Sequence, residues 1–238
     1  MARTSTPVLL FLLAFIALPA AGQSAFRGEG GVSFMIGVPQ GDFGDQVDNL
    51  GFGGSLYGAF GPASSPILVG ADLGFLIYGH ERRSEPFSTT IPDVTVDVTT
   101  SNNLVSGHLF ARLQPAEGPF RPYLDALFGF KYLFTETSIQ SEGFNDGNGN
   151  VASSTNFDDT AVSYGFGGGV QIQVYDGANN PDAPSAVYIE LGGRYLLGGE
   201  ADYLKEGSIR RENGRVAFDV TRSRTDLMTV NLGVGIRF

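Results

Sequence analysis

Apolar and polar residues alternate along most of this chain with a period of two. The clearest case is the end of the chain, where Val230, Leu232, Val234, Ile236 and Phe238 share one face and small or polar residues occupy the other. Alternation of this kind predicts a β-strand with one buried or lipid-facing side. A purely apolar face that continues to the last residue is typical of a strand between lipid and a barrel interior.

Eight segments carry the alternation and are predicted to be strands. They are residues 31–38, 52–60, 67–78, 103–113, 124–134, 162–174, 187–195 and 230–238. The connections after the second and fourth segments are short and the one after the sixth is moderate, whereas the others are long and polar. Transmembrane barrels have short periplasmic turns and long outer loops. The pattern therefore predicts an all-β fold, an eight-stranded antiparallel up-and-down transmembrane β-barrel.

A ten-stranded barrel is the rival arrangement, and its extra pair would have to come from residues 199–224. This segment is rich in charge and has no apolar face of the ~9–11 residues that a strand needs to cross lipid. It does contain Asn213-Gly214, a strong signal for a two-residue hairpin turn. We expect a hairpin that stands above the membrane, with Glu212 opposite Arg215 and Ile209 opposite Phe218. Residues 94–98 are expected to extend the fourth strand in the same way.

The first 22 residues are predicted to be an export signal, and residues 23–238 to form the barrel domain. Arg3 supplies a positive start, residues 8–18 are apolar, and residues 19–22 offer small side chains for cleavage after Gly22, with Ser24 as the alternative. The apolar stretch is too short to cross a bilayer as a helix, which needs ~20 residues.

Composition narrows the function classes. The chain has no cysteine, which excludes disulfide scaffolds and thiolate metal sites. Its formal net charge of −10 argues against nucleic acid as a partner, because phosphates require a basic surface. The combination of 34 glycines with 19 phenylalanines is typical of strands in a curved sheet rather than of disordered chain.

Four segments resemble the small outer-membrane β-barrels of the OmpA and OmpX type. They are residues 121–124, 163–170, 190–195 and 233–238. The resemblance implies a location in the bacterial outer membrane, contact with its lipid and lipopolysaccharide, and no periplasmic domain. It also implies that Phe238, with Ile236 and Val234, is the signal that the barrel-assembly machinery reads. The group includes structural anchors, adhesins, evasion factors and a few enzymes, so it implies architecture more than activity.

The predicted inner face collects seven ionisable residues: Asp72, His108, Arg112, Asp125, Lys131, Glu190 and Arg194. They comprise three acids and three permanent cations besides the histidine, whereas an ion-selective ring favours one sign. An eight-stranded barrel is only wide enough to be filled by its own side chains. We therefore expect a structural network of paired charges in a filled lumen, without a continuous channel.

Two groupings invite a catalytic interpretation. If the fourth and fifth strands pair, His108 would lie near Asp125 with Ser106 close by, like parts of a hydrolase triad. That site would sit inside a packed barrel with no route for a substrate. His80 with Ser84 superficially resembles the rim residues of barrel enzymes that act on lipid A, but no further motif supports it. No catalytic residue is assigned.

Residues 136–160 are expected to form the longest loop, and part of it resembles a calcium loop. Residues 146–150 place oxygen ligands at alternate positions. The match then fails, since Val151 replaces the sharp-turn glycine and Phe157 replaces the bidentate glutamate. A flexible turn is the simpler interpretation. No metal site and no cofactor are predicted.

The sequence thus favours a monomeric, non-enzymatic outer-membrane barrel with a filled lumen. Its role would be in envelope structure, surface adhesion or binding through extracellular loops. The alternative is a narrow solute channel or a lipid-modifying enzyme of the same membrane. A soluble lipocalin-like barrel is a third and weaker possibility, because that fold needs its apolar face inside.

Overall fold

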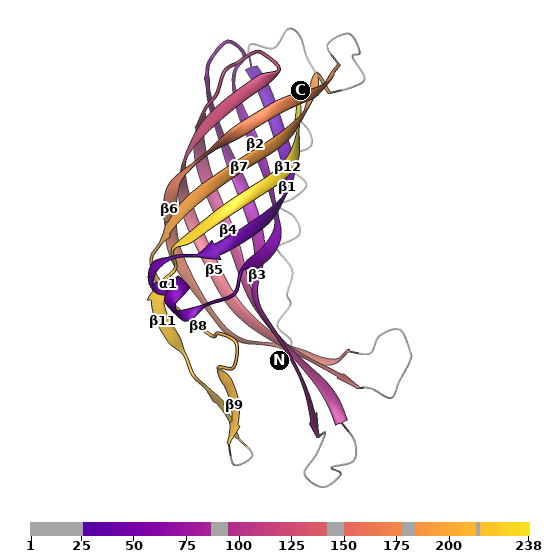
Figure 1. Ribbon diagram of the computed structural model, residues 1–238, viewed down its shortest axis with the longest axis vertical. Coiled ribbons are helices and arrows are strands. Elements are labelled where there is room, and N and C mark those ends of the chain that lie inside the picture. Colours follow the sequence, from indigo (N-terminus) through magenta and orange to yellow (C-terminus); the bar gives the residue numbers. More distant parts are fainter. Residues whose placement is uncertain (1–25, 87–94, 142–149, 178–183, 213–214) are drawn as a thin grey trace, which may run out of the picture.

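The computed structural model describes residues 26–86, 95–141, 150–177, 184–212 and 215–238, and eight strands of it close into an antiparallel barrel (Figure 1). These strands are β1 (Phe26–Pro39), β2 (Gly51–Pro62), β3 (Ile67–Pro86), β4 (Thr95–Leu113), β5 (Phe120–Ser141), β6 (Asn150–Asp176), β7 (Ala186–Gly198) and β12 (Leu227–Arg237). Neighbours in sequence are neighbours in the ring, and β12 pairs with β1 to close it. The predicted eight-stranded barrel is confirmed, while the predicted signal peptide lies outside the described residues.

Apolar side chains cover the outside of the barrel, and the inside holds the buried polar and charged side chains together with a buried apolar cluster of Ala59, Leu68, Phe110, Leu127 and Leu196. Val32, Leu109 and Phe166 are 64%, 68% and 66% exposed on the outer surface. On the same strands, the alternate residues point inward and are mostly buried. Continuous exposure of this many large apolar residues requires lipid rather than water around the barrel. A lipocalin-like barrel with an apolar interior is therefore excluded.

The two ends of the barrel differ in their connections. One end, here called the turn end, carries the connections 63–66, 114–119 and 177–185, and it also holds Phe26 and Phe238 (top of Figure 1). The opposite end, here called the loop end, carries the connections 40–50, 87–94 and 142–149 and the hairpin between β7 and β12. The predicted alternation of short and long connections holds only when the strand extensions at the loop end are counted with the connections, because 87–94 and 142–149 are no longer than 177–185.

Four strands continue past the loop end as a projecting sheet. β3 pairs with β4 as far as Pro86 and Thr95, and β5 pairs with β6 as far as Gln140 and Asn150. The expectation of a loop is therefore wrong for residues 136–141 and 150–160, while 142–149 lie outside the described residues. The upward extension of the fourth strand is confirmed from Thr95 onward. Strands that leave the lipid no longer need an apolar face. Alternation of hydrophobicity consequently fades in the sequence while the backbone pairing continues.

A second projection is the predicted hairpin between β7 and β12. β8 (Glu200–Tyr203) pairs with β11 (Thr221–Arg224), and β9 (Ile209–Glu212) pairs with β10 (Arg215–Phe218). Glu212 lies opposite Arg215 and Ile209 opposite Phe218, so the predicted register is confirmed. The turn residues 213–214 themselves lie outside the described residues.

An apolar cluster seals the lumen at the loop end. Its centre is Phe43 on the short helix α1 (Gly41–Gln46), between β1 and β2. Phe43 is fully buried and makes edge-to-face contacts with Tyr78 and Tyr203, with ring centroids 5.6 and 5.2 Å apart. The other members are Met35, Val47, Leu76, Leu104, Leu133, Ala161, Ala201 and Leu227. In the part of the chain that is described, no helix is long and apolar enough to span a bilayer.

Candidate functional site: the charged lumen

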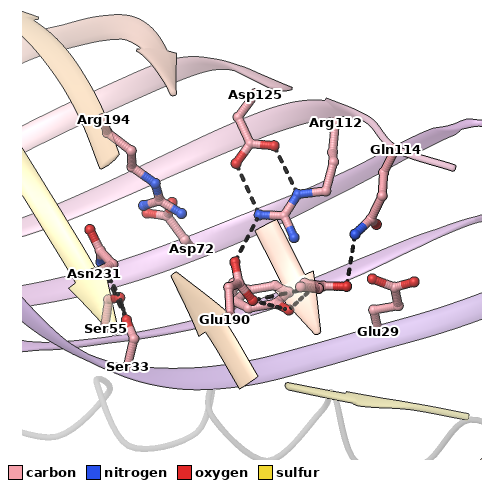
Figure 2. A network of polar contacts seen from close by, with 12 residues as sticks. Glu29, Ser33, Ser55, Asp72, Arg112, Gln114, Asp125, Glu190, Arg194 and Asn231 are labelled. Carbon is pink, nitrogen blue, oxygen red and sulfur yellow. Dashed lines mark hydrogen bonds and ion pairs between the residues drawn. The ribbon is translucent and has the colours of Figure 1, made fainter. Parts of the chain in front are cut away.

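All seven ionisable residues predicted for the inner face lie inside the barrel, and Figure 2 shows Asp72, Arg112, Asp125, Glu190 and Arg194 among them. Six of them are less than 9% exposed, and the partly exposed Arg194 reaches inward to Asp72. Buried charges at this density persist only if each is paired or hydrogen-bonded. The partner of each charge therefore decides what the lumen can do.

Arg112 is the centre of the network. It lies on β4 directly opposite Asp125 of β5, and two parallel hydrogen bonds of 2.8 and 2.9 Å join Arg112 Nε and Nη2 to the carboxylate. Glu190 approaches Arg112 Nη2 from β7 at 3.4 Å. The guanidinium also stacks over the ring of Tyr123 at 3.9 Å. This bidentate, stacked arrangement fixes the arginine in one orientation, as a structural pair does.

A second group of charges surrounds Asp72 of β3. Arg194 Nη1 donates to Asp72 Oδ2 at 2.5 Å, and His108 Nδ1 lies 3.3 Å from Asp72 Oδ1. His108 Nε2 lies 2.9 Å from the hydroxyl of Ser163. The strand register sets this arrangement, because Asp72 lies directly opposite His108.

The expected grouping of His108 with Asp125 and Ser106 is wrong. Arg112, four residues along β4 from His108, is the residue that faces Asp125, and His108 takes Asp72 and Ser163 instead. A serine, a histidine and an aspartate are thus adjacent, but they are Ser163, His108 and Asp72. Ser163 is fully buried, so no substrate can reach its hydroxyl, and Asp72 is already bound to Arg194.

Lys131 stands apart from the ion pairs. Its side chain is fully buried, and Nζ donates to the backbone carbonyl oxygens of Leu196 at 3.0 Å and Thr225 at 2.5 Å. Both carbonyls belong to the chain where β7 ends and β12 is about to begin. The ammonium group therefore ties β5 to the base of the β8–β11 hairpin through backbone carbonyls.

Several polar residues of the lumen were missed by the sequence prediction. Gln114 Nε2 donates to Gln171 Oε1 at 2.7 Å, and Gln171 Nε2 donates to Glu190 Oε2 at 3.2 Å. The hydroxyl of Tyr57 donates to the same Glu190 oxygen at 2.8 Å. These neutral groups satisfy the second oxygen of Glu190, whose first oxygen faces Arg112.

Near the turn end, Arg121 donates to Glu29 and, at 2.9 Å, to Gln114 Oε1. Glu29 and Arg27 lie on the same face of β1 as Gly31, because they are separated from it by even numbers of residues. Extending the alternation of that strand toward its start would have found both residues.

No protein-family model and no curated protein matches this chain. Among solved structures it is similar to Neisserial surface protein A (NspA), with 14% identity, a TM-score of 0.38, and coverage of 91% of this chain and 98% of that one. A major outer membrane protein of Thermus thermophilus is 14% identical with a TM-score of 0.35, over 89% and 99% of the two chains. The N-terminal β-barrel domain of Pseudomonas aeruginosa OprF is 11% identical with a TM-score of 0.28, over 90% and 98%.

The closed ring of eight strands, apolar outside and polar inside, decides the architecture. The fold is that of the small outer-membrane β-barrels. The resemblance stated from the sequence is confirmed at this level, and it rests on the strand pairing and the lipid-facing surface of this chain.

The rim of the barrel does not bring His80 and Ser84 together as a pair. His80 Nδ1 lies 3.3 Å from Ser101 Oγ, whereas the hydroxyl of Ser84 donates to Asp97 Oδ1 at 2.8 Å. Hydrogen bonds from Arg82 and Ser84 hold the pKa of Asp97 below its usual value. These contacts link β3 to β4 in the projecting sheet and need no catalytic explanation.

The described part of this barrel contains no group of three or more histidine, aspartate or glutamate side chains arranged to hold a metal ion. Residues 146–149 of the calcium-like stretch lie outside the described residues. Asn150, its last member, begins β6.

Proposed function

We propose that this protein is a non-enzymatic bacterial outer-membrane barrel that acts through the β-structure at its loop end. The turn end would face the periplasm and the loop end the outside of the cell, the orientation usual for barrels with short periplasmic turns. Its role would be in surface adhesion or binding, with the barrel as a closed anchor in the envelope. The observation that carries the proposal is a sealed lumen beneath a projecting sheet.

The sealed lumen argues against a transport function. Apolar side chains centred on Phe43 fill the loop end, and the ion pairs of Arg112 and Asp72 fill the middle. In the middle of the lumen, Arg112 is paired with Asp125 and Arg194 with Asp72 within hydrogen-bond distance. A barrel of eight strands has little room beyond its own side chains.

The projecting sheet offers an unpaired edge. β6 pairs with β7 only from Ser163 onward, and the last contact of β6 with the hairpin is that of Asp159 with the backbone N–H of Asp202 at 2.8 Å. Among the described residues, no strand pairs with this edge of β6 over 150–158. Unpaired backbone groups of an edge strand are a template for a partner's strand.

The opposite edge of the sheet is protected. On β3, Arg83 Nη1 donates to the carbonyl oxygen of Ile209 at 3.1 Å, and Glu81 accepts from the N–H of Gly207 at 3.1 Å. The edge strand itself carries several charges and ends at Pro86. Charge, proline and coverage are the usual means of blocking strand addition. The β6 edge has none of these over 154–157, so it is the better binding surface.

Planar-bilayer recording tests whether the lumen is closed. The purified protein is expected to give no steady single-channel current, because the apolar cluster and the ion pairs block the path. Phe43→Ala serves as the comparison, since it thins the seal without touching the ion pairs. Steady current from the unaltered protein would contradict the proposal.

Single cysteines test the orientation, since the chain contains none of its own. Ser154→Cys, on the exposed part of β6, is expected to react with a membrane-impermeant maleimide on intact cells. Ser64→Cys, exposed in the 63–66 turn, should react only after the outer membrane is opened. Labelling of both on intact cells, or of Ser64→Cys alone, would reject the orientation.

Shortening the projecting sheet tests the binding role. Replacing residues 138–153 by an Asn-Gly turn joins paired positions of β5 and β6 and leaves the barrel intact. We expect cells that express this variant to adhere less to mucin-coated plastic, while heat-dependent gel migration stays normal. A matched variant with a shortened β9–β10 hairpin should adhere nearly as well as the full protein. Equal adherence of all three would reject this sheet as the binding surface.

A further inference from the structure

The turn end of the lumen collects three arginines around one side-chain carboxylate. Arg27 on β1 is 6% exposed and Arg121 on β5 is fully buried, while Arg237 on β12 is partly exposed at the mouth. Glu29 is the one acidic side chain among the groups whose charges act on Arg27, and the other three are Arg121, Arg237 and Tyr188. In the middle of the lumen, by contrast, Arg112 alone faces two carboxylates. Positive charge is therefore in excess at this end.

Hydrogen-bond donors at the same place lack acceptors. All three guanidinium nitrogens of Arg27, Nη1 of Arg121 and the hydroxyl of Tyr188 are buried and have no partner among the described residues. Glu29 accepts from Arg121 through one oxygen, and its second oxygen is the one buried acceptor at this end without a partner among the described residues. The terminal carboxylate of Phe238 lies at this end too, but an oxygen of Phe238 is held by the N–H of Gly28 at 3.1 Å.

A buried donor without an acceptor is costly, and for a charged group the cost is higher. Water could accept the hydrogen bonds, but it would leave the excess positive charge in a low-dielectric interior. An anion would satisfy both. The unpaired buried atoms at this end are five donor atoms, on Arg27, Arg121 and Tyr188, against one acceptor, Glu29 Oε2. Guanidinium forks match the oxygens of phosphate in pairs.

We propose that the turn end of the lumen binds a phosphate group, held by Arg27 and Arg121 with the hydroxyl of Tyr188 as a further donor. Arg237, partly exposed at the mouth, would attract the anion from the periplasmic side. Its own side chain is anchored to the turn connections, since Nη1 donates to the carbonyl oxygen of Ala116 at 3.1 Å. The group could arrive as free inorganic phosphate or as the headgroup of a phospholipid in the adjoining leaflet.

Unfolding in phosphate-free octyl glucoside micelles tests the site. Sodium phosphate is raised to about 100 mM while sodium chloride keeps the ionic strength constant, and the midpoint of urea unfolding is recorded. The midpoint is expected to rise with the logarithm of the phosphate concentration. In Arg27→Met the phosphate needed for half of the shift should increase at least about tenfold. Arg222→Met, an exposed arginine at the loop end, is the control and should respond like the unaltered protein.

Tyr188→Phe keeps the test decisive if Arg27→Met fails to fold. Its hydroxyl has no partner in the described structure, so its removal should leave stability without phosphate equal or higher, yet weaken the response to phosphate. Micelles doped with phosphatidylglycerol, compared with neutral lipid, separate the two sources of phosphate. A response to either source that depends on Arg27 supports the site. The absence of any response to inorganic phosphate and to phosphatidylglycerol in the unaltered protein would overturn it.

Discussion

The loop end and the middle of the lumen are both closed, but by opposite kinds of contact. At the loop end, Phe43, Tyr78 and Tyr203 pack with aliphatic side chains that come from strands, a helix and the hairpin. In the middle, Arg112 and Asp125 close the lumen with directional bonds between neighbouring strands. Apolar packing tolerates gradual loss, whereas a buried ion pair fails when one partner leaves. The difference predicts that the middle holds the barrel together and the loop end merely closes it.

Removing Arg112 is expected to have the largest effect. Arg112→Met leaves Asp125 and Glu190 as unpaired buried carboxylates and should lower the free energy of unfolding by about 3–5 kcal/mol. Urea unfolding in micelles measures it. The double variant Arg112→Met/Asp125→Leu removes one of the stranded charges and should recover part of the loss. If Arg112→Met lowered the free energy of unfolding by less than a surface substitution does, the middle of the lumen would not be more important for stability than the loop end.

Trimming the apolar cluster should cost less. Phe43→Ala leaves a cavity, but α1 is a short helix of 6 residues that can move into it, so we expect a loss of about 2–3 kcal/mol. Leu50→Ala, in the same connection but 49% exposed, is the control and should change stability by less than about 0.5 kcal/mol. If Phe43→Ala matched Arg112→Met, the loop end would be as essential as the middle.

Ser163→Ala tests whether the buried serine has any role beyond a hydrogen bond. It removes the contact with His108 and should cost about 1 kcal/mol, without changing adherence or assembly. Ser33→Ala, which removes another hydroxyl inside the lumen, is the matched control. Loss of adherence in Ser163→Ala alone would contradict a purely structural middle.

The smallest expected effect is a loss of stability at acidic pH, and it is confined to the projecting sheet. Hydrogen bonds from Arg82 and Ser84 lower the pKa of Asp97 in the folded state, so its contribution to stability is present above its unfolded pKa and is lost as the pH falls through the folded pKa. Protease cleavage of the β3–β4 projection is expected to rise only in this acidic range. Asp97→Asn should be cleaved equally at all pH values. If cleavage instead changed near neutral pH, a titratable group other than Asp97 would be responsible.

Alternation predicts the strands and which side chains point inward, because both follow from the two-residue period of a single strand. It cannot predict partners across the barrel. Arg112 meets Glu190 from a strand 78 residues away, and His108 meets Ser163 rather than Asp125. Such contacts depend on register and on strand tilt around the whole ring.

The structure differs from the sequence prediction at two other places, both outside the part of the barrel that lipid surrounds. The projecting parts of β5 and β6 pair in water, so polar residues at 136–141 and 150–160 predict a loop where the backbone forms strands. The helix α1 has only 6 residues and no apolar period, and Gly41 adopts a φ of +54° that only its missing side chain makes easy. Nothing in the local sequence distinguishes the buried Phe43 from a loop residue.

The pairing of β1 with β12 has a consequence for how the molecule comes into being. Glu29 lies opposite Arg237, so the seam joins residues from nearly opposite ends of the chain. Until β12 is in place, β1 and β7 each have an edge with unpaired backbone groups. The barrel can therefore close only after the last strand has arrived. Until then, the unpaired strand edges of the chain must be kept from pairing with strands of other proteins.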